Sequence, residues 1–436
     1  MKILIKIQEI IIFLIYKIHF SLFKKTPGQF TKKFLKNLFF AFLGIGGATL
    51  ITFGFNILTI RYLGPAEFGK WNLIGSVAEF FVILPLWGLT TASLRYLGAE
   101  RDKYKEIIGT SFRTVFLLSI LFFPFYFILA PALSNFLKID ISLFYYSLLY
   151  AFILVFFYLF QSFFQGLEKF KQLSKLLIDS ALIFVVVVLF YLFTLKNYSF
   201  ETLLWGNIWR VSLIVFVSFL VFRKSLFKFS HQVFNKLFHY GSFSMLSVFA
   251  GFFSLGMIDN LMINYYLGLE AVGLYAVYYI AFSVFVGKIL NTFSQVFLPA
   301  VSGHKDIITL FNQLLILMKK TGVLVLGGMF VLTWLLFQFY GSAFVFDWRL
   351  ALLMAISVTL YTFLMILGNI IASAGIRGAR FGVIFSISSA VINVTLNALL
   401  IPHFGLFGAI SASIIATLVI FFAALYVLQF KLTKNE

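Results

Sequence analysis

The stretch that decides the fold is Asp259-Asn-Leu-Met-Ile-Asn-Tyr-Tyr-Leu-Gly268, which continues as Leu269-Glu-Ala-Val-Gly273-Leu-Tyr275. It places an acid and amides inside an apolar run, and it closes the run with a tight glycine-containing connection. The same pattern occurs once earlier, around Arg61-Tyr-Leu-Gly64-Pro-Ala-Glu-Phe-Gly69-Lys-Trp71. An offset of 204 residues is shared by Asn56 and Asn260, Gly64 and Gly268, Gly69 and Gly273, and Trp71 and Tyr275. Leu-Gly connections are common between membrane helices, but an offset near half the chain length predicts two similar halves.

The composition places the chain in a membrane. Of its 436 residues 62% are hydrophobic and 11% are charged, and the mean hydropathy is +1.03, whereas a soluble domain has roughly 25% charged residues. There is no cysteine, and the five histidines show no metal-ligand spacing. We find no phosphate-binding loop, nucleophile elbow or dinucleotide fingerprint. These features predict an all-α polytopic membrane protein that is not an enzyme and has no metal or cofactor.

Apolar runs long enough to cross about 30 Å of hydrocarbon recur along the chain. We predict twelve spans, near residues 37–60, 71–93, 111–133, 143–165, 176–195, 203–222, 241–266, 271–297, 315–340, 350–374, 381–402 and 408–430. With the N-terminus inside, 27 of the 34 Lys and Arg fall on cytoplasmic segments, five fall on outer connections and two lie within spans. This asymmetry predicts an even number of spans, with both termini cytoplasmic in the cell membrane. Because the cations alternate between loops, the net charge of +19 indicates membrane anchoring rather than nucleic-acid binding.

The same pattern predicts the domain organisation. Residues 1–36 form a basic amphipathic segment on the cytoplasmic membrane surface. An N-lobe of six spans (37–222) and a C-lobe of six spans (241–430) are joined by a basic cytoplasmic linker (223–240), and 431–436 form a cytoplasmic tail. Two halves in the same orientation are related by an axis along the membrane normal.

Several motifs resemble those of a known family. Tyr62-Leu-Gly-Pro-Ala-Glu-Phe-Gly69, with Leu89-Thr-Thr-Ala-Ser-Leu-Arg95-Tyr at the end of span two, resembles the oligosaccharide flippases that move undecaprenyl-pyrophosphate-linked repeat units. The run from Asp259 to Tyr275 looks like their seventh-helix signature. Leu298-Pro299, and Asn397 followed by Ile401-Pro402 and Phe404-Gly-Leu-Phe-Gly-Ala409, look similar as well. The resemblance covers most of the chain from about Lys36 to Phe430.

The resemblance implies a fold and a mode of action. The family belongs to a superfamily with the MATE-type multidrug exporters and the lipid II flippases, so it implies two six-helix lobes around a V-shaped central cavity that works by alternating access. It also implies an anionic lipid-linked glycan as substrate. One departure is Asn260, because relatives often have a basic residue after the seventh-helix acid.

Ionisable residues inside spans are the candidate functional residues, because each costs at least about 2.5–3.5 kcal/mol in hydrocarbon and usually faces a cavity or a partner. For a pyrophosphate head group we predict Arg210 and Lys288, with Arg61 and Arg95 at span ends next. The alternative for Arg210 is a structural pair with Asp259 or Glu79. For Arg61 and Arg95 interfacial anchoring is favoured over substrate contact. For coupling to H⁺ or Na⁺ the candidates are Asp259, Glu79 and Asp179. The alternative for Asp259 is a structural ion pair or a hydrogen bond to Asn260 or Asn56.

The sequence therefore predicts a flippase that carries a lipid-linked oligosaccharide across the cytoplasmic membrane for surface polysaccharide (lipopolysaccharide or capsule) biosynthesis. Its partners would be the lipid-linked substrate, membrane lipids and polysaccharide assembly proteins. A cation-coupled multidrug exporter of the same fold is the alternative, and it predicts an acidic rather than a basic cavity. A membrane glycan polymerase or ligase is disfavoured because the outer connections are short, and a scaffold would not need a basic cavity.

Overall fold

The structure, a computed structural model, describes residues 29–254, 256–284, 290, 307–373 and 376–429. The predicted surface segment up to residue 28, Lys288, Leu298-Pro299 and the tail 431–436 lie outside the described residues. Within the described residues there are helices and no strand. The helices are α2 (Gln29–Leu86), α3 (Leu89–Ala99), η1 (Arg101–Lys103), α4 (Tyr104–Leu137), α5 (Ile141–Gly166), α6 (Phe170–Leu189), η2 (Phe190–Thr194), α7 (Glu201–Phe222), α8 (His231–Ser254), α9 (Gly256–Leu267), α10 (Leu269–Val284), α12 (Ile307–Tyr340), α13 (Trp348–Ser373) and α14 (Ile376–Val427).

Two of these helices contain a chain reversal at a glycine. Gly64 in α2 has φ 74° and Gly405 in α14 has φ 58°, a left-handed backbone that only glycine adopts without strain. Contacts on the two sides of Gly64 agree with the reversal, because Gly44 in α2 packs on Ser174 of α6 and Gly88, just after α2, packs on Gly241 of α8. The first two predicted spans are therefore joined by a break at one residue rather than by a loop.

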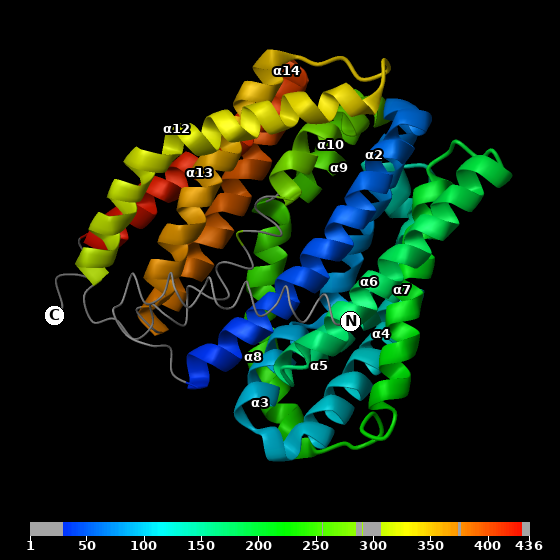
Figure 1. Ribbon diagram of the computed structural model, residues 1–436, viewed down its shortest axis with the longest axis vertical. Helices are drawn as coiled ribbons and strands as arrows, with labels where there is room; N and C mark the ends of the chain where they lie inside the picture. The colour runs from blue at the N-terminus through cyan, green and yellow to red at the C-terminus, as the bar shows by residue number, and fades with distance from the viewer. Residues whose placement is uncertain (1–28, 255, 285–289, 291–306, 374–375, 430–436) are drawn as a thin grey trace.

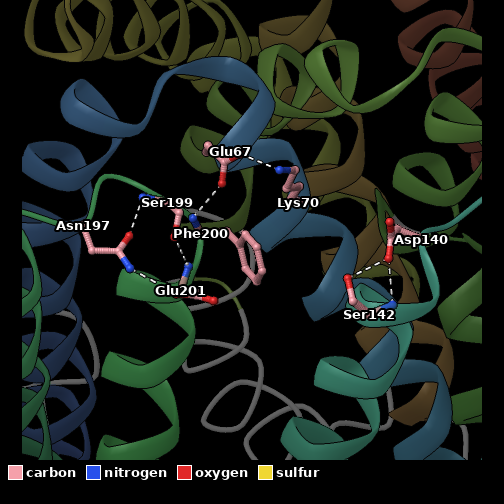
Figure 2. Close-up of polar contacts among 8 residues, drawn as sticks. All are labelled: Glu67, Lys70, Asp140, Ser142, Asn197, Ser199, Phe200 and Glu201. Atoms are coloured by element: carbon pink, nitrogen blue, oxygen red, sulfur yellow. Dashed lines mark hydrogen bonds and ion pairs between the residues drawn. The ribbon is translucent and has the colours of Figure 1, made fainter.

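The end of the bundle that carries Gly64 and Gly268 is called here the Gly64 end, and the opposite end the Arg101 end. At the Gly64 end, Glu67 accepts a hydrogen bond from the backbone N–H of Phe200 at 2.9 Å and pairs with Lys70, which ties α2 to the start of α7 (Figure 2). Asp140 caps α5 there by accepting from the N–H and the hydroxyl of Ser142, and these bonds lower the pKa of its carboxyl (Figure 2). At the Arg101 end, Arg101 pairs with Glu168, and Lys236 pairs with Glu100 at 3.0 Å.

By length and hydropathy, seven of the described helices can each cross a membrane, or up to nine when two bent pairs are counted as single spans. These pairs are Gly46–Leu86 with Leu89–Ala99, bent by 54°, and His231–Phe253 with Gly256–Leu267, bent by 44°. With the reversals in α2 and α14, every predicted span has a helix at its position, although the eighth is described only as far as Val284 and then at Leu290. The chain is a multi-pass membrane protein.

The helices form two groups. In Figure 1, α12, α13 and α14 gather on one side of the view and α4 to α7 on the other, with α8, α9 and α10 between them. We call α2 to α7 the N lobe and α8 to α14 the C lobe. Helix α8 begins at His231, inside the predicted linker, because Val233 and Leu237 are buried in a core that consists mainly of N-lobe residues.

The two lobes meet at the Gly64 end through their repeated glycines. A Cβ placed on Gly69 would lie 1.9 Å from the carbonyl oxygen of Leu269, and one on Gly273 would lie 1.9 Å from the carbonyl oxygen of Pro65. Pro65 and Leu269 are themselves separated by the repeat offset. The contact is therefore reciprocal, as a pseudo-two-fold axis between similar halves requires.

Candidate functional site

One cavity, called here the N-lobe cavity, is lined mainly by α2, α3 and α5 of the N lobe, with α8 of the C lobe on one side. Its volume is about 390 Å³, within the usual range of about 300–1,000 Å³ for ligand pockets. It extends from Glu79 toward the Arg101 end, where Leu94 and Gln165 line it. Among the described lining residues none is cationic, and the polar ones are Glu79, Thr90, Thr91, Tyr158, Gln161, Ser162 and Gln165. This lining differs from the basic lumen that the sequence predicts.

A charged cluster borders this cavity. The hydroxyl of Tyr158 in α5 donates a hydrogen bond to Glu79 in α2. Arg210 in α7 interacts with the hydroxyl of Tyr150 and acts electrostatically on Tyr158, as does Glu79. The Nε of Arg210 is buried without a hydrogen-bond partner among the described residues. The structure thus groups Arg210 with Glu79 rather than with Asp259, and leaves a buried donor of this guanidinium available.

The second polar site surrounds Asp259 in the C lobe. This carboxylate is fully buried and accepts four hydrogen bonds. The donors are the Tyr275 hydroxyl of α10 at 2.7 Å, the Asn393 and Asn397 amides of α14 at 3.1 and 2.7 Å, and the Ser413 hydroxyl of α14 at 3.2 Å. A small cavity of about 20 Å³ lies beside them. Neither Asn56 nor Asn260, the partners considered from the sequence, is among these donors.

The side chains around Asp259 suit the binding of a small hard cation. Such cations prefer oxygen ligands, and this site holds a carboxylate, two hydroxyls and two amide side chains. The Oδ1 of Asn397 is buried with no hydrogen-bond partner among the described residues, so turning an amide would bring a carbonyl oxygen toward Asp259. No cluster of three or more His, Cys, Asp or Glu that would hold a transition metal occurs in the described part of the chain. The arrangement can take up a proton or a monovalent cation.

Arg61, Arg95 and Asp179 do not line either of these two sites. Arg61 is exposed at the Gly64 end, where its side chain packs beside Gly341. Arg95 is exposed near the Arg101 end, with its guanidinium 4.6 Å from the ring centre of Tyr240. Asp179 is exposed on α6. Lys288 lies outside the described residues.

The sequence interpretation missed most partners of Asp259 and Glu79. Asn393 and Asn397 are one turn apart in an apolar helix, and this i, i+4 spacing of two amides is a signal that points to a shared polar site. Tyr158, Gln161 and Gln165 lie in a run rich in Phe and Tyr, where no pattern distinguishes them from other residues.

Comparisons with known proteins agree with this architecture. The family model described as "Polysaccharide biosynthesis protein" matches residues 34–304. An inward-facing multidrug resistance MATE family transporter of the MOP superfamily is similar in structure, with a TM-score of 0.68 and 15% identity over 89% of this chain and 96% of that one. A transporter of the same description in the outward-facing conformation has a TM-score of 0.61 and 14% identity over 92% of this chain and 96% of that one. A eukaryotic MATE transporter has a TM-score of 0.59 and 15% identity over 92% and 96%. Among curated proteins no sequence matches the chain.

The structural matches confirm the predicted fold class, an all-helical membrane bundle of two MATE-like lobes. The family match extends from the first helix across the lobe boundary and covers more than half of the chain. The chain therefore belongs to the polysaccharide biosynthesis protein family.

Proposed function

We propose that the protein is a flippase that moves a lipid-linked oligosaccharide of the undecaprenyl-pyrophosphate type across the cytoplasmic membrane by alternating access. The observation that carries this proposal is the N-lobe cavity, because its amide and hydroxyl side chains suit the hydroxyl groups of sugars. Membership in a polysaccharide biosynthesis family supports the same substrate class. The lipid tail stays in the bilayer and the protein makes or breaks no covalent bond.

The proposed orientation follows from the distribution of charge. With the cation-rich Arg101 end in the cytoplasm, the cavity is entered from the side on which lipid-linked precursors are made. The glycan occupies the neutral polar cavity and Arg95 lies near its entrance. Arg210, with its buried Nε, meets the pyrophosphate deeper in the lobe, and Lys288 completes the set of cations.

Cation coupling is assigned to Asp259. H⁺ or Na⁺ binding there changes which donors the carboxylate accepts, and each state of the protein is favoured by the ligand that binds it better. Glu79 at the cavity is the second candidate for coupling. Asp179 is the weakest candidate, because its carboxylate is exposed and its ionisation is not tied to the packing of the helices. Polysaccharide assembly proteins remain the expected partners.

One observation favours the alternative, a cation-coupled multidrug exporter. Glu79 is the single charged side chain among the described residues of the cavity wall, and an acid there would attract an organic cation. The hydrogen bond that Glu79 accepts from Tyr158 opposes this role, because it already engages the carboxylate, and Arg210 acts on the same tyrosine. Transport substrates decide between the two functions.

The test uses proteoliposomes that contain undecaprenyl-pyrophosphate-linked oligosaccharide, with glycan accessibility measured on each leaflet. We expect the wild-type protein to expose glycan on the far leaflet. Arg210→Ala should slow this by about tenfold to a hundredfold, because a hydrogen bond to a charged group is worth roughly 1.5–3 kcal/mol. Arg349→Ala is the matched control, since Arg349 is exposed at the Gly64 end.

Three results are informative. Flipping by the wild type that is lost only in Arg210→Ala supports both the function and the role of Arg210. If Arg210→Ala flips glycan as fast as the wild type, the proposed function stands and the role of Arg210 is structural. Uptake of organic cations without any glycan movement would replace the flippase by the exporter.

A further inference from the structure

Helix α9 has polar side chains that contact both lobes. It is 12 residues long, about 18 Å at the usual rise per residue. Asp259 contacts α10 and α14 of its own lobe. Asn260 and Asn264, one turn apart and therefore on one face, contact the N lobe. One short helix thus joins the buried acid to the contact between the lobes.

The bonds to the N lobe are made by the two amides. The Nδ2 of Asn260 donates to the hydroxyl of Ser76 in α2 at 3.0 Å. The Nδ2 of Asn264 donates to the backbone carbonyls of Lys138 and Leu137, at 3.1 and 3.5 Å. These carbonyls lie where α4 ends, and such groups have no partner within their own helix. Lys138 adds a cation–π contact, its Nζ 4.0 Å from the ring centre of Tyr265.

These bonds belong to the contact that closes the lobes at the Gly64 end. They lie on the same side of the molecule as the reciprocal packing of Gly69 on Leu269 and of Gly273 on Pro65. Breaking them leaves buried polar groups without partners, because Asn260 and Asn264 are 8% and 6% exposed. The lobes therefore separate at this end only if α9 gives up its amide bonds.

Helix α9 is separated from its neighbours in a way that allows it to move as a unit. It is bent by 44° relative to the preceding helical segment, His231–Phe253. After it, Gly268 has φ +85°, a left-handed turn that ends the helix. A short helix between a bend and a glycine turn can tilt without repacking the longer helices.

We propose that α9 couples cation binding at Asp259 to opening at the Gly64 end, with Asn260 and Asn264 as the positioning residues. This rests on the proposed function only in taking Asp259 as the coupling site; it does not depend on which substrate is carried. The ligand is a monovalent cation, H⁺ or Na⁺.

The rearrangement follows from the hydrogen bonds at Asp259. The carboxylate accepts from four donors, and a bound proton turns one of its oxygens into a donor, so at least one of the four bonds must be broken or reversed. Sodium requires oxygen ligands, so the amides of Asn393 and Asn397 must turn. We expect either change to shift α9 relative to α10 and α14, and such a shift would strain its bonds to Ser76, Leu137 and Lys138.

The groups that face Asp259 make it the one that responds to pH in this part of the structure. The titratable groups of α10 near it are the hydroxyls of Tyr275 and Tyr279. From α14 it meets two amides and a hydroxyl, and Tyr361 of α13 lines the adjoining cavity. These described neighbours are hydroxyls and amides, so Asp259 is the single carboxylate among them.

The test exploits the lack of native cysteine. Ala276→Cys is the reporter, because Ala276 is buried in α10 and lies one turn after Gly273 on the same face. The rate at which a membrane-impermeant maleimide labels it is measured in proteoliposomes from the side of the Gly64 end. A pH series in K⁺ buffer and a Na⁺ series at fixed pH separate the two cations.

The reporter protein is the chain with Ala276→Cys as its one substitution. In it we expect H⁺ or Na⁺ to raise the labelling rate about threefold to tenfold, because the loss of one hydrogen bond changes an equilibrium by about that factor. Asp259→Asn should be labelled at one rate whatever the cation. Asn260→Ala with Asn264→Ala should be labelled fast in every buffer while still binding the cation, measured directly as Na⁺ binding or proton uptake. Asn260→Ala alone should also raise the labelling rate. Ser76→Ala removes the Asn260–Ser76 hydrogen bond from the other lobe and should raise the rate by the same factor.

Asn207→Ala is the matched control, because the buried amide of Asn207 bonds to the Leu203 carbonyl within its own helix. It should keep the cation response. The inference is overturned if the Asn260 and Asn264 double variant still responds to the cation as the reporter protein does, if cation binding leaves the reporter rate unchanged, or if the reporter protein binds neither cation. A cation response without any movement of lipid-linked glycan would leave this inference standing and would remove the proposed substrate.

Discussion

At the scale of single residues, the N-lobe cavity is notable for two side-chain amides, Gln161 and Gln165, one turn apart in α5. Each can donate to and accept from a sugar hydroxyl. We predict that Gln161→Leu with Gln165→Leu lowers the flipping rate about tenfold at low substrate concentration, because sugar hydroxyls left unpaired in the cavity each cost about 1–3 kcal/mol. The measurement is the initial rate of glycan appearance on the far leaflet.

The control for this prediction is Gln172→Leu, which makes the same chemical change at an exposed position of α6 and should leave the rate unchanged. A double variant that flips as fast as wild type would show that the glycan does not contact these amides. A variant that loses glycan transport but keeps cation-dependent labelling of Ala276→Cys would locate its defect in substrate binding.

At the scale of the elements, the reciprocal glycine contact sets how closely α2 and α10 approach. Replacing a helical glycine by alanine ordinarily stabilises a helix by about 0.5–1 kcal/mol. At Gly69 and Gly273 we predict the opposite sign, because the added Cβ would collide with a backbone carbonyl of the other lobe. Either substitution should raise the labelling of Ala276→Cys severalfold, and the two effects should be similar because the positions are related by the repeat.

Gly75→Ala is the matched control in the same helix, since a Cβ there meets nothing within 4 Å. It should leave labelling at the reporter rate. Unchanged labelling in both Gly69→Ala and Gly273→Ala would mean that this contact does not hold the Gly64 end closed. A thermal melt of each purified variant separates an opened lobe contact from a misfolded chain.

At the scale of the whole molecule, the charge distribution orients the bundle. We predict that Asp102→Cys, exposed at the Arg101 end, reacts with impermeant maleimide only from the cytoplasmic side. Ser342→Cys, exposed beside Gly341 at the Gly64 end, should react only from the outside. Labelling of intact cells and of inverted membrane vesicles measures both. The reverse pattern would invert the proposed direction of entry into the cavity.

Much of the architecture could be predicted from the sequence because the constraint imposed by hydrocarbon is local. Each crossing segment must satisfy its own backbone hydrogen bonds and be apolar over about 20 residues, so helices can be predicted one at a time. The repeat could be predicted for a similar reason, since Gly64 and Gly268 both adopt positive φ and their loop motifs place Gly69 and Gly273 alike. Asp259, Glu79 and Arg210 could be selected because charge inside a span is costly.

Only the tertiary structure decided which polar groups meet. Asp259 bonds to Asn393, Asn397 and Ser413, which are 134, 138 and 154 residues away. Successive helical residues point about 100° apart, so a small difference in helix rotation decides whether an acid meets a cavity, a partner or lipid. This is why Asp179 proved exposed and Arg210 proved to be grouped with Glu79. Hydropathy determines that a segment crosses the membrane, but the packing of side chains from distant segments determines which face of it turns inward.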